Sequence, residues 1–171
     1  MKTLYSLGVA MIAVVLFATG AIADPGNTWD KKFDAAGRFH VLSQFNNAAV
    51  LDRETGRVWE QSPIEDNRRW SSAHSSCYER EIGGRLGWRL PTIEELASLV
   101  DRSQQNPALP AGHPFSKVQF NFYWSATTDT LNPSAALLVD LGTGEVERGT
   151  KELAELHFWC VRGGQGIDGV Q

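Results

Sequence analysis

The chain has 171 residues, with 16 lysines and arginines against 20 aspartates and glutamates, which gives a formal net charge of −4. This length suits one domain, and the acidic balance without a dense basic cluster excludes nucleic acid as an expected partner, because phosphate-binding proteins present a basic face. Sulfated glycans and other polyanions are disfavoured for the same reason, with a local patch around Arg68, Arg69 and Arg85 left as an alternative.

The first residues predict a secretory signal peptide over residues 1–23. Lys2 precedes an apolar run over residues 7–17, and Ala21 and Ala23 form a cleavage pattern of small residues before Asp24. The run is shorter than the roughly 20 residues of a spanning helix, so we expect no transmembrane anchor after cleavage. The mature protein is expected in the periplasm or outside the cell.

The mature chain begins with a polar stretch, residues 24–37, which predicts a loose N-terminal arm. Trp29 and Phe33 would attach it to the body of the domain. The near alternation of apolar residues over residues 38–44 then predicts a strand, with Phe39 and Val41 on one face.

A β-hairpin is predicted over residues 48–61, with Gly56 in the connecting turn. Asp52 and Glu54 in the same turn offer an alternative interpretation as a calcium site. The turn lacks the full series of oxygen ligands of an EF-hand loop, so the hairpin interpretation is preferred and no metal is expected.

The first predicted helix follows, capped by Asp66 or Asn67 and ended by the two glycines at residues 83–84. Trp70, Ala73 and Cys77 recur on one face of it. The helix therefore places Cys77 toward the core.

A second helix is predicted from the segment around residues 87–96. Pro91 closes the preceding element, Thr92 is the N-cap, and Glu95 can reach back to the Thr92 amide, which together make a capping box. We interpret this segment as scaffold, and the helix is expected to end near residues 101–102.

The second half of the chain predicts strands separated by loops. A long irregular segment, residues 103–121, precedes a strand over residues 122–127 that starts with aromatic residues including Tyr123 and Trp124. These rings are interpreted as core, with a carbohydrate-stacking platform as the alternative. Further strands are predicted over residues 135–141, 146–149 and 157–162, and a flexible tail over residues 165–171.

Cys77 and Cys160 are the only cysteines, and an even count in an exported chain predicts a disulfide. The bond would join the first helix to the middle of the last strand. A redox-active or catalytic pair is the alternative, and the spacing is not that of a C-x-x-C motif.

The order of these motifs resembles a family of bacterial exported domains related to the C-terminal domain of the Legionella collagen-like adhesin (Lcl). The resemblance extends over residues 46–164, within a domain expected over residues 38–164. It rests on ten residues in particular: Trp59, Trp70, Trp88, Arg89, Leu90, Pro91, Thr92, Glu95, Trp124 and Arg162.

The resemblance implies an α+β, C-type-lectin-like fold, with two helices on a twisted, mostly antiparallel sheet and long irregular loops. The same architecture is found in formylglycine-generating enzymes. The calcium-dependent sugar-binding motifs of C-type lectins do not occur in this sequence, and the adhesin's association with sulfated glycans through a basic surface does not transfer to an acidic chain.

No catalytic motif or histidine pair at ligand spacing is present. We therefore expect a non-enzymatic module without cofactor that recognises a glycan, an envelope component or a protein through loops 103–121 and 129–134. Tyr123, Asp129 and Asn132 are the candidate contacts. The alternatives are a sulfatase-modifying-factor-like enzyme or accessory factor, and a structural subunit of an envelope assembly. The sequence does not specify an oligomeric state.

Overall fold

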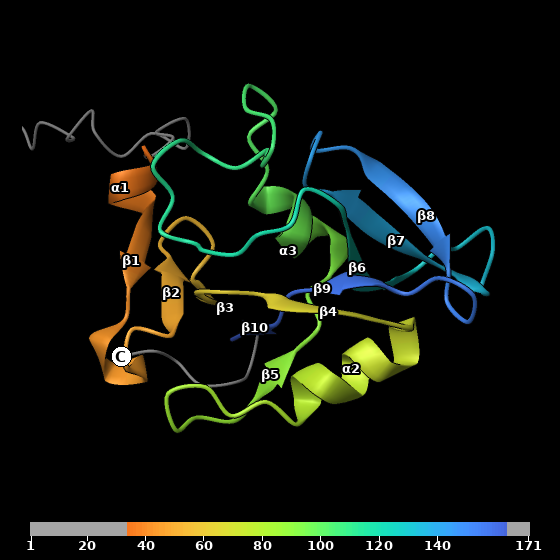
Figure 1. Cartoon of the computed structure of the whole chain (residues 1–171), viewed down its shortest axis with the longest axis horizontal. Coiled ribbons are helices and arrows are strands. Elements are labelled where there is room, and N and C mark those ends of the chain that lie inside the picture. Colours follow the sequence, from red (N-terminus) through yellow and green to blue (C-terminus); the bar gives the residue numbers. More distant parts are fainter. Residues whose placement is uncertain (1–33, 164–171) are drawn as a thin grey trace, which may run out of the picture. The chain divides into compact units, whose positions relative to one another are not determined.

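A computed structural model of the protein describes residues 34–163 (Figure 1). The predicted signal peptide, the attachment of the arm by Trp29 and Phe33, and the tail over residues 165–171 lie outside the described residues. Within residues 34–163, every helix is too short or too polar to cross a membrane.

The described chain alternates short helices with strands. In order, the elements are α1 (Ala35–Arg38), β1 (Phe39–Val41), η1 (Ser43–Phe45), β2 (Ala49–Asp52), β3 (Arg57–Glu60), β4 (Ile64–Arg68), α2 (Trp70–Tyr78), β5 (Trp88–Arg89), α3 (Ile93–Ser98), β6 (Phe122–Thr128), β7 (Ala135–Asp140), β8 (Val146–Thr150), β9 (Leu156–Phe158) and β10 (Val161–Arg162).

The strands form two five-stranded sheets, in the orders β1-β2-β3-β10-β5 and β4-β9-β6-β7-β8. Pairing is antiparallel except between β6 and β9, which are parallel. The α+β class with mostly antiparallel strands is therefore confirmed. The described chain differs from the expected single sheet in having two, and α1 is an additional helix.

The predicted hairpin is confirmed as β2 and β3, and Gly56 adopts a φ of +68° in its turn. Asp52 at the end of β2 is fully buried and receives two hydrogen bonds from Arg38, at 2.9 and 2.7 Å. The prediction of a loose arm is wrong at its end, because Asp34 caps α1, which contains residues 35–37 and also Arg38, the first residue of the predicted strand. Asp52 is thus engaged by an arginine rather than arranged for calcium.

The start of the first predicted helix was wrong. Asp66 and Asn67 lie in β4, which pairs with β9, and α2 begins at Trp70 after Arg69, whose side chain makes no capping bond. The helix ends at Tyr78, before the two glycines. Ala73 and Cys77 are fully buried on its inner face, as predicted.

The start of the second helix is confirmed. The Thr92 hydroxyl accepts a hydrogen bond from the Glu95 amide at 3.3 Å, and the Glu95 carboxylate accepts one from the Thr92 amide at 2.9 Å. The helix α3 ends at Ser98, several residues earlier than expected. Both α2 and α3 contact β6, but the buried residues of α3 pack with Tyr123 and those of α2 with Trp124, so the two helices cover opposite faces of this strand. Figure 1 shows the two helices apart from each other, with strands between them.

The last predicted strand is two strands in different sheets. β9 ends at Phe158 and pairs with β4 and β6, whereas β10 begins at Val161 and pairs with β3 and β5. Cys160 lies in the break between them rather than in the middle of a strand. It forms a disulfide with Cys77 (Cα–Cα 5.4 Å), which confirms the predicted pair and ties α2 to the junction of the two sheets.

Candidate functional site

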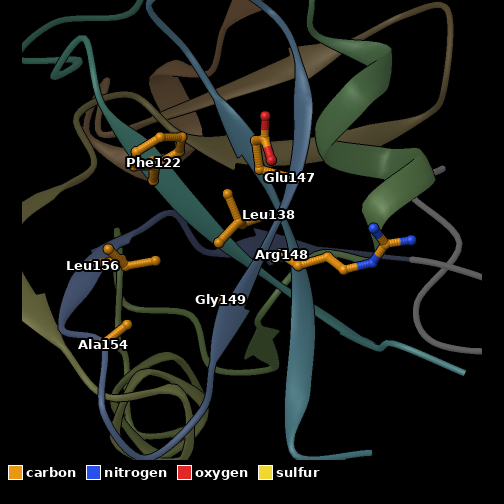
Figure 2. Close-up of a pocket in the computed structure, with 7 residues that line it drawn as sticks. All are labelled: Phe122, Leu138, Glu147, Arg148, Gly149, Ala154 and Leu156. Carbon is orange, nitrogen blue, oxygen red and sulfur yellow. The ribbon is translucent and has the colours of Figure 1, made fainter. Parts of the chain in front are cut away.

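An open pocket of about 190 Å³ lies on one face of the sheet formed by β6, β7 and β8 (Figure 2). The segment that connects β8 to β9 closes one side of it. The lining is mostly apolar and consists of Phe122, Leu138, Glu147, Arg148, Gly149, Ala154 and Leu156.

Strand alternation explains which side chains face the pocket. Trp124 pairs with Leu138, which pairs with Glu147, so these residues share one face of the sheet, together with Phe122 two positions before Trp124. The opposite face carries Tyr123 and belongs to the buried core under α3.

The floor of the pocket depends on a glycine. A Cβ atom at Gly149 would lie 2.7 Å from Cη2 of Trp124 and 2.8 Å from Cδ2 of Leu138, which is closer than atoms can pack. Gly149 therefore lets the Trp124 ring and Leu138 press against the edge strand. Trp124 is held in this position because its Nε1 donates to the Arg68 carbonyl at 2.9 Å.

The two charged residues of the lining differ in their roles. Figure 2 shows Arg148 pointing away from the apolar cluster, and its guanidinium lies 2.8 Å from the Asp129 carboxylate on the other side of the strand. Glu147 lies on the pocket face and is exposed. The charge at the pocket rim is therefore negative.

Two of the three predicted ligand contacts lie in loop 129–134. Asp129 is nearly buried, and its carboxylate accepts from the Leu131 amide at 3.0 Å in addition to the pair with Arg148. Asn132 is exposed and accepts from the Ser134 amide at 3.2 Å. The Asp129 carboxylate thus fixes the loop, and Asn132 is the more accessible of the two.

Tyr123 is not available as a contact, because its exposed fraction is 0%. Its ring stacks on His157 with centroids 5.4 Å apart, and its hydroxyl accepts from the Gln119 amide at 2.8 Å. Burial raises the pKa of Tyr123 to about 12. Trp124 and Trp88 are buried as well. The interpretation of Tyr123 and Trp124 as core is therefore confirmed, and the alternative of a carbohydrate-stacking platform built from these rings is wrong.

The remaining motif residues build the scaffold. Trp59 and Leu90 are fully buried, Trp70 Nε1 donates to the Ser125 carbonyl at 2.8 Å, and Arg162 Nε donates to the Leu86 carbonyl at 2.8 Å.

Glu95 is the centre of a polar cluster at the start of α3. Its carboxylate receives two hydrogen bonds of 2.7 Å from Arg89, one from Arg57 and one from the Thr92 amide. Burial raises the pKa of Glu95, but these hydrogen bonds outweigh burial and lower it to about 2. These charge-assisted bonds therefore join the start of α3 to Arg57 in β3 and to Arg89 in β5.

The environment of the disulfide contains one buried carboxylate. Glu60 accepts from the Cys160 amide at 2.9 Å and from Arg80 Nε at 2.9 Å. Burial raises the pKa of Glu60, with the bonds from Cys160 and Arg80 acting in the opposite direction. Both sulfur atoms are bonded to each other, so neither is a free thiol.

The histidines do not form a joint site. Buried ring nitrogens of His74, His113 and His157 lack a hydrogen-bond partner, and burial lowers the pKa of each ring. Within residues 34–163, no three histidine, cysteine or acidic side chains are grouped as metal ligands.

The pocket was missed at the sequence level. Phe122 is one of several aromatic residues at the start of the predicted strand over residues 122–127. Leu138, Gly149 and Leu156 belong to three different strands, and the apolar pattern within each segment does not predict how these strands pair. The available signal was Gly149, the last residue of the predicted strand over residues 146–149, because glycine in a strand often marks a close approach of another part of the chain.

Comparison with known proteins gives one family. The model of the Lcl C-terminal domain matches residues 48–162, which is more than half of the chain and includes every pocket residue. No curated protein matches the chain.

Proposed function

Because the chain belongs to the Lcl C-terminal domain family, which is adhesin-related, we propose that it is an exported, non-enzymatic binding module whose pocket on β6, β7 and β8 receives an apolar side chain of a protein partner. The open apolar pocket beside Phe122 is the observation that carries this proposal.

The size and lining of the pocket favour a side chain over a sugar. A cavity of about 150 Å³ holds one benzene ring, so a pocket of about 190 Å³ accommodates one large aliphatic or aromatic side chain. Phe122, Leu138 and Leu156 offer apolar contacts, and Glu147 is the one charged side chain of the lining that lies on the pocket face. A sugar would require several polar groups converging on it to fix its orientation.

Binding is favoured over the enzyme alternative by the state of the cysteines. A formylglycine-generating type of activity needs reactive thiols, and Cys77 and Cys160 are joined and fully buried.

Because the pocket is lined by β6, β7, β8 and the segment that leads to β9, loops 103–121 and 129–134 are not the centre of the proposed site. The loop that closes the pocket is instead the connection between β8 and β9.

Site-specific photo-crosslinking in the producing cells tests the proposal. A photoreactive phenylalanine analogue is placed at Phe122, which lines the pocket and is 37% exposed, or at Phe120, which is 58% exposed and lies outside the lining. We expect a protein adduct from position 122 that is absent from position 120. Ala154→Phe, which fills the pocket, should abolish the adduct, whereas Leu153→Phe at the exposed neighbouring position should not.

Equal adducts from positions 120 and 122, or an adduct insensitive to Ala154→Phe, would show that the pocket is not the binding site. A glycan array signal that depends on Phe122 would replace the protein partner by a sugar. If light scattering finds a stable oligomer of identical copies in which position 122 still forms the adduct, the copies associate through another face of the molecule. That result would favour the structural-subunit alternative for that face.

A further inference from the structure

We propose that the protein holds its partner by strand addition: an extended polypeptide segment pairs antiparallel with the free edge of β8, places an apolar side chain in the pocket and sets cationic side chains against Glu147 and Glu145. This inference rests on the proposed function and adds the chemical pattern of the partner.

The edge of β8 has backbone groups available for pairing. β8 is the terminal strand of its sheet, and the amide of Asp140 donates to the Glu145 carbonyl while the amide of Lys151 donates to the Ser134 carbonyl. Ladder bonds alternate along an antiparallel pair. Glu145, Glu147 and Gly149 therefore bond to β7, and the N–H and C=O groups of Val146 and Arg148 face outward.

The same alternation places the pocket beside this edge. Glu147 and Gly149 line the pocket, and a residue opposite Gly149 on an added strand would project on the pocket face. Because Gly149 has no side chain, the residue opposite it meets no competing group on the edge strand. An apolar residue at this position would reach the pocket lined by Leu138 and Leu156.

The charges at the rim define the neighbouring positions of the partner. Glu145 and Glu147 are exposed on the pocket face, and no ion pair joins either to another described residue. Arg148 is paired with Asp129 on the opposite face. Opposite charges directly across two strands stabilise their pairing. The segment should therefore carry an apolar residue opposite Gly149, a cation two positions later opposite Glu147, and a second cation four positions later opposite Glu145.

A second copy of the chain fits this edge less well. When β8 pairs with itself about a two-fold axis through its centre, the two central registers set Arg148 opposite Arg148 or Glu147 opposite Glu147. Like charges directly opposite are destabilising, and charged edge strands are a common protection against self-association. A cationic segment of another protein is therefore the preferred occupant.

Nuclear magnetic resonance titration of the purified, oxidised protein with defined peptides tests the inference. The probe is acetyl-Leu-Thr-Lys-Thr-Lys-amide, whose threonines lie opposite Arg148 and Val146. We expect shifts at the amides of Val146 and Arg148 and at the pocket residues. N-methylation of both threonine amides should weaken binding about tenfold or more, because two backbone hydrogen bonds are lost.

Three further comparisons change one feature at a time, two in the peptide and one in the protein. Replacement of both lysines by glutamate should weaken binding several-fold and reverse its salt dependence, because salt screens the repulsion between glutamates on the two strands. Replacement of leucine by serine should remove the pocket shifts. In the protein, Val146→Pro removes an outward N–H at an edge position where proline is tolerated, and should weaken binding at least fivefold. Val146→Thr, which keeps the N–H, should not.

The outcomes separate this inference from the proposed function. If the N-methylated peptide binds as tightly as the parent and Ala154→Phe still abolishes binding, strand addition is wrong and the pocket stands. If binding needs the free amides but ignores Ala154→Phe, the proposed pocket is wrong. Absence of binding by the parent peptide at millimolar concentration to the folded protein overturns the proposed partner pattern.

Discussion

Gly149 of the edge strand β8 lies directly against the ring of Trp124, two strands away in the same sheet: a Cβ atom at this glycine would meet Cη2 of the indole at 2.7 Å. The contact joins the floor of the pocket to the buried core, since Trp124 has no exposed surface.

Gly149→Ala should therefore destabilise the protein and distort the pocket. Overpacking of this kind costs about 1–3 kcal/mol, measured as a loss in the free energy of unfolding in urea. Val146→Ala, at an exposed position of the same strand, is the control and should change stability by about 0.5 kcal/mol or less. An alanine at position 149 with unchanged stability would mean that the indole moves away without cost.

Glu95→Gln should reduce stability at neutral pH by about 2 kcal/mol, given the charged bonds to Arg57 and Arg89 and partial screening by solvent. The pKa of Glu95 in the folded protein is about 2, below the value of an unfolded glutamate. Its contribution is therefore present above about pH 4.3 and is lost as the pH falls toward 2.

The measurement for Glu95 is urea unfolding of both proteins between pH 7 and pH 2. The difference between the parent protein and Glu95→Gln should shrink across the acid range. A difference that does not depend on pH would show that the carboxylate acts by shape and hydrogen bonding alone.

Glu60 should show the opposite pH dependence. Burial raises the pKa of Glu60, so the folded state favours the protonated carboxyl, and the contribution of Glu60 to stability is fully present below the pKa of an unfolded glutamate. It is lost as the pH rises through the raised value. The stability of the parent protein relative to Glu60→Gln should thus fall with rising pH, and carbon-13 detection of the carboxyl group should give the titration directly.

Replacement of Cys77 and Cys160 by alanine should lower the free energy of unfolding by about 4 kcal/mol, because the disulfide closes a long loop, with a sequence separation of 83 residues, in the unfolded chain. Titration of thiols in the oxidised parent should find none before or after unfolding. Reactive thiols in the folded protein would contradict the scaffold role and restore the enzyme alternative.

Sequence reasoning succeeded where the signal was local. The capping box of Thr92 and Glu95 needs only residues three apart, and the turn at Gly56 needs only a glycine between two apolar runs. Both were predicted and are present. The pairing of Cys77 with Cys160 followed from counting.

It failed where a distant strand decides the conformation. Aspartate is a favoured residue type at a helix N-cap, but the segment that contains Asp66 pairs with β9 and forms the strand β4 instead. The stretch from His157 to Arg162 has continuous strand character, and its break at Cys160 is set by two sheets that diverge there. Tyr123 is a candidate contact in the sequence because it lies beside loop 103–121, whereas packing against His157 and Trp159 buries it.

The late position of β9 and β10 in the chain has a consequence for biogenesis. β9 lies between β4 and β6, and β10 lies between β3 and β5, so residues 156–162 occupy interior places in both sheets. In a nascent polypeptide that lacks them, β5 has no strand to join it to β3, and β4 has no strand to join it to β6. Neither sheet closes until these residues have left the ribosome, so a chain carried across a membrane during synthesis would still be unfolded when it passes.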